Sequence, residues 1–293
     1  MTPMDRLSQL PFVRWVRRYR GPLSIAVIVV SLALLGFYVA THQDSVRRLL
    51  SVSPWVLLAL GLLYAGVVLS NVFITYATVK LCKKELPFAG SVSLTVYSTV
   101  ANFFGPLQSG PGLRAVYLKT KIGLRIRDYT YATLFYYGAF GILNVSLLFI
   151  NSYPLLTLLG IIVGAAALYV GVKKFRFHDR LRFIVMICMM TLAQILLTSV
   201  IYFIELHATQ TAASYMQALV YSASANLSLF VSITPGGIGI REAFIIFTQS
   251  LHHISLASIV AAGVLDRAFY VLFLVVLFAV SSALHIKQSL LHK

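Results

Sequence analysis

Long apolar runs without a charged residue recur along this chain and limit what it can fold into. The first, residues 22–41, contains no Asp, Glu, Lys or Arg, and similar runs follow at 54–79, 129–150, 155–172 and 183–204. A helix of about twenty residues, rising about 1.5 Å per residue, crosses the hydrocarbon core of a bilayer. Inside hydrocarbon an α-helix satisfies its own backbone hydrogen bonds. The sequence therefore predicts an all-α polytopic membrane protein, and 22–41 is too long for a signal peptide and is expected to stay as an anchor.

Composition and charge agree with this prediction and exclude other classes. Only 11% of the residues are charged, against about 25% in soluble domains. The net charge of +16 would suggest nucleic-acid binding in a soluble protein. Here the basic residues occupy short connectors between apolar runs, a placement that favours anionic lipid headgroups, so we expect no nucleic-acid partner. Cys82 and Cys188 are far apart and form no metal-binding motif, and the chain has no nucleotide-binding loop; we expect neither a metal nor a cofactor.

One segment inside the apolar region is unsuited to a continuous helix. Residues 232–244 read Ser-Ile-Thr-Pro-Gly-Gly-Ile-Gly-Ile-Arg-Glu-Ala-Phe. Proline removes a backbone donor and glycine weakens a helix. At membrane depth such a break persists only where protein buries it or water reaches it. The segment is therefore the best candidate for a site, and its candidate residues are Pro235, Gly236, Gly237, Gly239, Arg241 and Glu242.

A second break, at residues 105–112, indicates an internal repeat. The heptapeptides 96–102 and 220–226 agree at five of seven positions, and each precedes a Pro/Gly-rich break that ends near an arginine, Arg114 or Arg241. Charge placement puts the two breaks on opposite sides of the membrane, as in the inverted repeats of transporters. We predict about six to eight transmembrane helices plus two re-entrant or broken segments, with repeats at about 54–150 and 183–286. The alternative is two unrelated kinks in a helical bundle.

The distribution of basic residues predicts the orientation. Most of the 24 Lys and Arg residues lie in the N-terminal segment, in the connectors at 80–87, 114–127 and 173–182, and in the C-terminal tail, whereas the connectors expected on the other side hold only Arg47 and Arg48. Positively charged connectors usually face the cytoplasm. We therefore expect a cytoplasmic N-terminus (1–21), a single transmembrane domain (22–286) and a cytoplasmic tail (287–293).

The charged and amide residues near the breaks suggest a headgroup-binding chemistry. A helix starting after Gly239 would present free N–H groups, and Arg241 or Arg114 would add a fork suited to phosphate. The hypothesis is a phosphate-bearing lipid headgroup held between the two breaks. The alternative is that Glu242 only neutralises Arg241 in a structural elbow. The remaining candidates could bind ligand or serve as structural pairs and cross-links; they are Asp266, Arg267, Asn102 and Asn226.

The motif Pro-Gly-Gly-Ile-Gly-Ile-Arg-Glu at 235–242, together with Asn102, Pro106, Gly110 and Arg114-Ala115, resembles the lysylphosphatidylglycerol synthase transmembrane-region family. That family includes stand-alone membrane proteins and the flippase half of bacterial multiple peptide resistance factor. The resemblance implies movement of phospholipids between leaflets of a bacterial inner membrane, with re-entrant helices lining a cavity. It does not imply synthesis, because the aminoacyl-transferring domain of the two-part members is soluble and C-terminal. Family members often carry Arg and Glu in the first motif, where this chain has Gln108 and Pro111.

Three functions remain open at the level of the sequence. The first is a lipid flippase or transporter with anionic phospholipids as partners, and no enzymatic activity. The second is an intramembrane lipid-phosphate enzyme, which the 235–241 segment disfavours because it offers no serine nucleophile. The third is an accessory subunit that binds a lipid-modifying enzyme. A homo-oligomer is compatible with each of the three.

Overall fold

The computed structural model describes residues 52–104, 109–174, 177–209, 212–231, 237 and 239–291, and describes the side chains of these except 104, 178 and 282–291. All of them belong to one compact unit, Leu49–Lys293. The predicted anchor at 22–41 and the basic segment 1–21 lie outside the described residues. Every regular element in the described ranges is helical, which agrees with the predicted all-α polytopic class.

Five of the helices are long and apolar enough to cross a membrane. They are α5 (Pro54–Leu81), α8 (Ile126–Leu148), α9 (Pro154–Lys174), α10 (Leu181–Ala208) and α14 (Leu256–Leu291). The first four confirm the apolar runs from 54 to 204 to within a few residues. Asp266 and Arg267 interrupt an otherwise apolar stretch of the sequence, and both lie inside the continuous helix α14. Both side chains form ion pairs with residues of the neighbouring helix α12 (Ile240–Phe247). Their charges are therefore balanced by another helix, and α14 continues without a break.

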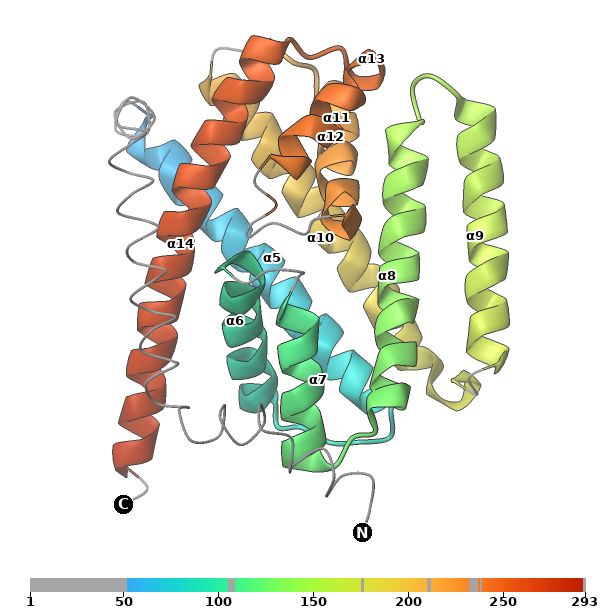
Figure 1. Cartoon of the computed structure of the whole chain (residues 1–293), viewed down its shortest axis with the longest axis vertical. Coiled ribbons are helices and arrows are strands. Elements are labelled where there is room, and N and C mark those ends of the chain that lie inside the picture. The colour runs from blue at the N-terminus through green and yellow to red at the C-terminus, as the bar shows by residue number, and fades with distance from the viewer. Residues whose placement is uncertain are drawn as a thin grey trace, which may run out of the picture. The chain divides into compact units, whose positions relative to one another are not determined.

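The shorter helices form two hairpins that enter from opposite ends of the unit (Figure 1). Helices α6 (Phe88–Phe104) and α7 (Ser109–Ile122) open at the end where α5 finishes and α8 starts. Helices α11 (Tyr215–Ser228) and α12 (Ile240–Phe247) open at the other end, where α10 finishes, and the single turn α13 (Gln249–His252) links α12 to the start of α14. A long helix, a hairpin and a long helix thus follow one another twice: α5, α6–α7, α8 and then α10, α11–α12, α14. This order is the one that the predicted repeats require.

The first hairpin depends on a close approach between its two helices. A Cβ atom at Gly110 would lie 2.6 Å from the carbonyl oxygen of Ser98 and 2.9 Å from Cβ of Asn102. Only a residue without a side chain fits there. The Ser109 hydroxyl also donates to the carbonyl of Ala101 at 2.5 Å. Gly110 and Ser109 therefore hold the start of α7 against the end of α6.

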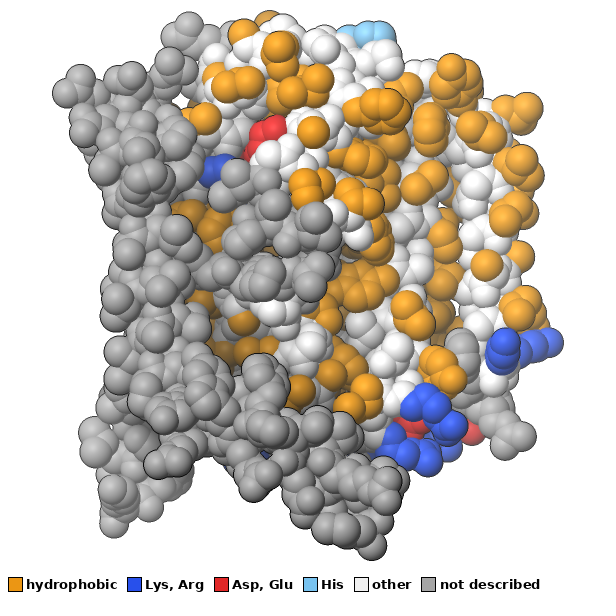
Figure 2. All heavy atoms as spheres, in the orientation of Figure 1, with side chains coloured by type: hydrophobic (Ala, Val, Ile, Leu, Met, Phe, Trp, Pro, Cys, Tyr) orange, Lys and Arg blue, Asp and Glu red, His pale blue; other side chains and the backbone are white. Residues whose placement is uncertain are grey.

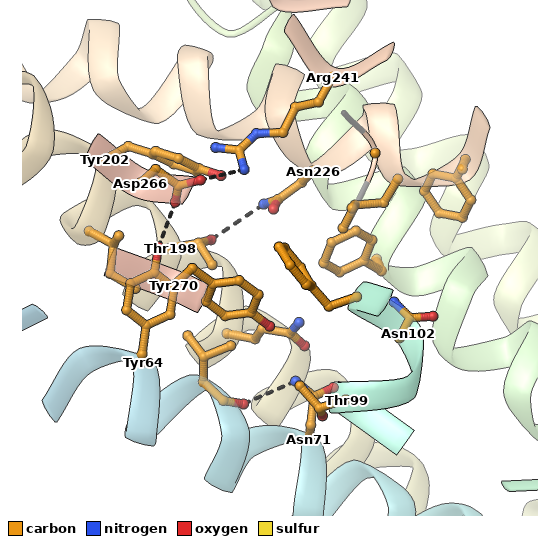
Figure 3. A pocket seen from close by; sticks show the side chains of 18 of the residues that line it. Tyr64, Asn71, Thr99, Asn102, Thr198, Tyr202, Asn226, Arg241, Asp266 and Tyr270 are labelled. Carbon is orange, nitrogen blue, oxygen red and sulfur yellow. Dashed lines mark hydrogen bonds and ion pairs between the residues drawn. The ribbon is translucent and has the colours of Figure 1, made fainter. Parts of the chain in front are cut away.

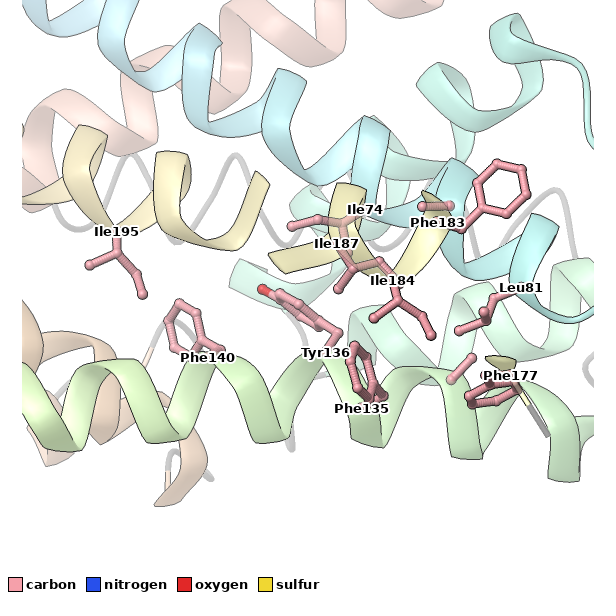
Figure 4. Close-up of a cluster of buried hydrophobic side chains, with 12 residues drawn as sticks. Ile74, Leu81, Phe135, Tyr136, Phe140, Phe177, Phe183, Ile184, Ile187 and Ile195 are labelled. Atoms are coloured by element: carbon pink, nitrogen blue, oxygen red, sulfur yellow. The ribbon is translucent and has the colours of Figure 1, made fainter. Parts of the chain in front are cut away.

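The largest apolar core lies between α5, α8 and α10 (Figure 4). Isoleucine and phenylalanine side chains dominate it, with Ile74 from α5, Phe135 and Phe140 from α8, and Ile187 and Ile195 from α10. Burying one such side chain contributes about 1.5–3 kcal/mol where the reference is water. This core fixes the long helices around the two hairpin tips.

Outer faces of the long helices carry apolar side chains (Figure 2). On α9 these include Leu155 and Val163, which are 81% and 59% exposed. In this view most of the visible Lys and Arg side chains gather at one end, near the start of α8 and the end of α9. An apolar belt with basic residues at one end is the surface expected of a membrane protein.

Candidate functional site

Described residues of both hairpins line one common cavity of about 230 Å³ (Figure 3). The first hairpin contributes Asn102 and Arg114, and the second contributes Asn226, Gly237 and Arg241. Helices α5, α8, α10 and α14 complete the wall with tyrosine, amide and charged side chains. Described residues on either side of the two breaks, far apart in the sequence, therefore border the same cavity between membrane-spanning helices.

In the first hairpin, Arg114 faces the cavity without a carboxylate partner. Its Nη1 lies 3.4 Å from the hydroxyl of Thr75, a long and weak contact. Its Nε is buried and has no hydrogen-bond partner in the described part of the chain. No carboxylate of the described residues lies within ion-pairing distance of this guanidinium. Arg114 therefore brings an uncompensated positive charge to the cavity wall.

Asn102, the predicted polar residue of the first hairpin, has a structural contact. Its Oδ1 accepts a hydrogen bond from the backbone N–H of Gly110 at 3.3 Å, so it satisfies a free donor in the first turn of α7. The same side chain lines the cavity. Asn102 thus joins α6 to α7 through its amide oxygen, and its side chain also borders the cavity.

The second hairpin begins its return helix as the sequence predicted. Gly237 and Gly239 have φ angles of 66° and 82°, in the left-handed region that favours glycine. Helix α12 starts directly afterwards, at Ile240. The backbone N–H of Gly239 donates to Oε2 of Glu242 at 2.8 Å. Glu242 therefore occupies the position at the helix start where the sequence analysis expected a ligand anion. Pro235 and Gly236 lie outside the described residues.

The charged residues of α12 and α14 form two crossed ion pairs. Arg241 Nη1 lies 2.6 Å from Asp266 Oδ2, and Arg267 Nη2 lies 3.1 Å from Glu242 Oε1. The sequence had suggested pairing between neighbours, Arg241 with Glu242 and Asp266 with Arg267. Adjacent residues on a helix point in different directions, so each charge pairs across the helix interface instead. These pairs lock α12 onto α14.

Asn226 joins three helices beside the cavity. Its Nδ2 donates to Oδ1 of Asn144 on α8 at 3.0 Å and to the hydroxyl of Thr198 on α10 at 3.3 Å. The side chain is 5% exposed, so both contacts are shielded from water. Asn226 therefore has the cross-linking role that the sequence analysis left open, at a position that also borders the cavity (Figure 3).

Sequence reasoning missed the residues around Asp266. The Tyr64 hydroxyl donates to Asp266 Oδ1 at 2.5 Å, and the Arg241 guanidinium lies over the Tyr202 ring, 5.2 Å from its centroid. Glu205 is fully buried near Tyr64. Glu205 directly follows the apolar run 183–204, and α10 continues past it to Ala208. The one sequence feature that could have singled out Glu205 is its position as an acidic residue directly after the apolar run 183–204.

Within the described ranges, no group of three or more His, Cys, Asp or Glu side chains converges as metal ligands would. What converges is a set of arginines, amides and tyrosines around a small polar space. Such a set suits hydrogen bonding to an oxyanion.

Fold and site together define an α-helical, multi-pass membrane protein with a cavity between its helices that is lined by both polar and apolar side chains. The chain belongs to the lysylphosphatidylglycerol synthase TM region family, which it matches over residues 23–277. All the candidate site residues fall inside the matched range. Membership of this family ties the protein to lipid metabolism. No curated protein gives a significant match to the sequence.

Proposed function

We propose that this protein moves phospholipids between the two leaflets of a membrane, with the headgroup passing through the cavity between the hairpins. The observation that carries the proposal is Arg114, whose charge has no carboxylate partner among the described residues. An uncompensated charge is costly inside a membrane, where ionisable residues commonly mark the paths of ions and substrates. Lipid phosphates are the anions that a membrane supplies in quantity.

The size of the cavity supports a headgroup as the cargo. Its volume of about 230 Å³ lies just below the roughly 300–1,000 Å³ typical of pockets that enclose a whole drug-sized ligand. A phosphate headgroup needs only part of that space, and the acyl chains would remain in the surrounding lipid. The protein would then carry the lipid without altering it, and so would not act as an enzyme.

The two hairpins give the proposed path its direction. In this proposal α6–α7 and α11–α12 are re-entrant segments that dip into the bilayer from opposite leaflets. Arg114 belongs to the hairpin that opens at the basic end, and Arg241 belongs to the other. We infer that the basic end faces the cytoplasm of a bacterial inner membrane, with both termini on that side. The protein could work alone, as a homo-oligomer, or beside a lipid-modifying enzyme.

Translocation by the purified protein tests the proposal directly. Liposomes containing the protein and fluorescent phosphatidylglycerol are treated with a membrane-impermeant quencher, and the rate at which inner-leaflet label becomes accessible is measured. Wild-type protein should accelerate this exchange. Arg114→Gln should slow it about tenfold or more, because a hydrogen bond to a charged group contributes about 1.5–3 kcal/mol and 1.4 kcal/mol is a factor of ten.

Arg125→Gln is the matched control, since it removes an arginine whose side chain is 75% exposed near the opening of the same hairpin. It should retain the wild-type rate, and Arg114→Lys should recover part of it. Equal rates for Arg114→Gln and wild type would remove Arg114 from the path. Absence of translocation by the wild-type protein would overturn the proposed function.

A further inference from the structure

A buried carboxyl, Glu205, lies beside the cavity without the partners that a carboxylate needs. It is 0% exposed and sits in the last turn of α10. Oε1 lies 3.4 Å from the Tyr64 hydroxyl, and Oε2 has no partner in the described part of the chain. An ionised carboxylate in such a place would be strongly disfavoured. Either a proton or an unseen cation must therefore balance Glu205.

The hydrogen bonds around Tyr64 show where a proton belongs. The phenol has one hydrogen, and its short contact is the one to Asp266 Oδ1, at 2.5 Å. With that hydrogen committed, Glu205 can bond to the phenol oxygen only by donating a proton of its own. The three groups then form a continuous chain in which Glu205 donates to Tyr64 and Tyr64 donates to Asp266.

Charge balance leads to the same assignment. Arg241 is the cation nearest to the two acids, and its Nη1 lies 2.6 Å from Asp266. One guanidinium balances one carboxylate, so Asp266 takes the negative charge and Glu205 keeps the proton. Arg267 does not alter this balance, because it is paired with Glu242 at 3.1 Å.

The other titratable groups facing this cluster do not compete for the proton. Tyr202 on α10, Tyr221 on α11 and Tyr270 on α14 are phenols, which are neutral near pH 7; they contact one another or Tyr64 through their rings. His252 on α13 lies 5.5 Å from the Tyr221 ring. Its Nδ1 accepts from the backbone of Ile254 and its Nε2 contacts the carbonyl of Ile245, the pattern of a neutral imidazole.

We propose that Glu205, Tyr64 and Asp266 form a proton relay that couples lipid movement to a proton gradient. In the coupled step Glu205 passes its proton to the Tyr64 oxygen while Tyr64 passes its own hydrogen to Asp266. Asp266 becomes neutral, Glu205 becomes a carboxylate, and Tyr64 is unchanged. A proton from the aqueous phase at the end of the unit where α10 finishes then restores Glu205. When the lipid has left Arg241, Asp266 releases the transferred proton into the cavity that it lines and pairs with Arg241 again, so that one proton has crossed per cycle.

Protonation of Asp266 changes what Arg241 can bind. Arg241 lines the cavity, and its Nε and Nη2 have no hydrogen-bond partners among the described residues. Once its one carboxylate is neutral, the guanidinium can take up a lipid phosphate in that carboxylate's place. One headgroup with a single negative charge then moves with one proton, and the transfer carries no net charge. The inference rests on the proposed function and adds its energy source.

The test uses the full protein in liposomes with fluorescent phosphatidylglycerol and an imposed pH difference. The leaflet distribution of the label should shift by up to about tenfold per pH unit, since a tenfold proton ratio balances a tenfold lipid ratio. A membrane potential imposed with potassium and valinomycin should not shift it, because the step is electroneutral. Tyr64→Phe and Glu205→Gln should abolish the response to pH. Tyr270→Phe removes a neighbouring phenol that forms no hydrogen bond with the other described residues, and it should keep the response to pH.

A second measurement reports on the proton without transport. Infrared spectra of the protein near neutral pH should contain the carbonyl band of a protonated carboxylic acid, and this band should disappear in Glu205→Gln. Its absence from the wild type would overturn the relay. If the protein moves lipid but neither the pH difference nor Tyr64→Phe changes that movement, the coupling is wrong and the proposed function stands. A wild-type protein that moves no lipid would overturn both the proposed function and the proton coupling.

Discussion

The two hairpins present corresponding arginines to the same cavity, but the protein treats the two charges differently. Within the described part of the chain, the one hydrogen bond of the Arg114 side chain is a 3.4 Å contact to a threonine hydroxyl. Arg241 in the second is paired with Asp266 at 2.6 Å, and its neighbour Glu242 is paired with Arg267. Arg114 of the first hairpin can therefore bind an anion directly. In the second hairpin, Arg241 is paired with Asp266 and can bind an anion only after Asp266 has been neutralised.

Their backbones also use glycine for different reasons. In the first hairpin Gly110 permits a close approach, since a Cβ there would meet the carbonyl oxygen of Ser98 at 2.6 Å. In the second, Gly239 has no neighbour within 4 Å of the Cβ position and is required by its φ of 82°. In the first hairpin α7 is held by packing against α6, whereas the return helix of the second hairpin, α12, is held to α14 by ion pairs. The two helical hairpins are therefore stabilised by different interactions.

The largest expected difference comes from the same substitution at the two arginines. Arg241→Gln should lower the free energy of unfolding by about 3–5 kcal/mol, because it leaves a buried carboxylate without its cation. Arg114→Gln should change it by about 1 kcal/mol or less, since it removes only a weak hydrogen bond. Reversible unfolding in mixed detergent micelles measures both.

The double variant Arg241→Gln/Asp266→Asn provides the control for this prediction. It removes both charges and should recover part of the stability lost in Arg241→Gln, because no unpaired charge remains. Equal losses at the two arginines would show that the contrast between the hairpins has no energetic basis.

The packing contrast predicts an effect of intermediate size. Gly110→Ala should destabilise the protein by about 1–3 kcal/mol, because the added methyl group collides with backbone atoms that cannot turn aside. Gly112→Ala is the matched control in the same helix, with nothing within 4 Å of its Cβ position. It should be neutral or slightly stabilising, as alanine is favoured over glycine in helices. Thermal unfolding of the two variants in one detergent tests this, and similar midpoints would argue against close packing of α6 and α7.

The smallest expected contrast concerns the two asparagines. Asn226→Ala should cost about 1–2 kcal/mol, since it removes two buried hydrogen bonds and leaves Asn144 without one of its partners. Asn102→Ala should cost about 1 kcal/mol or less, because it removes one 3.3 Å contact at a helix start. Urea-dependent unfolding of each variant gives the comparison. A larger loss at Asn102 would reverse the assignment of the better cross-link.

Much of the architecture could be predicted because it follows from local physical requirements. Uncharged runs long enough to cross a bilayer must be helical, and four of them appear as α5, α8, α9 and α10. The two Pro/Gly-rich segments had to lie against protein or water, and the described residues at both border one cavity. Gly239 was expected to precede a helix, and α12 begins at Ile240.

Sequence reasoning failed where the answer depended on which helices are neighbours. It offered Glu242 only as the alternative partner of Arg241, whereas the ion pair in the structure is with Asp266, twenty-five residues away on α14. It did not single out Tyr64 or Glu205, which become important only because α5, α10 and α14 bring them together.

By itself, the sequence determined a helical membrane protein with two interrupted segments, since hydrocarbon leaves a backbone few ways to satisfy its hydrogen bonds. Only the tertiary structure decided which arginine is neutralised and which is not. Electrostatic pairing depends on distances across helix interfaces, and those distances are set by packing far from the charges themselves.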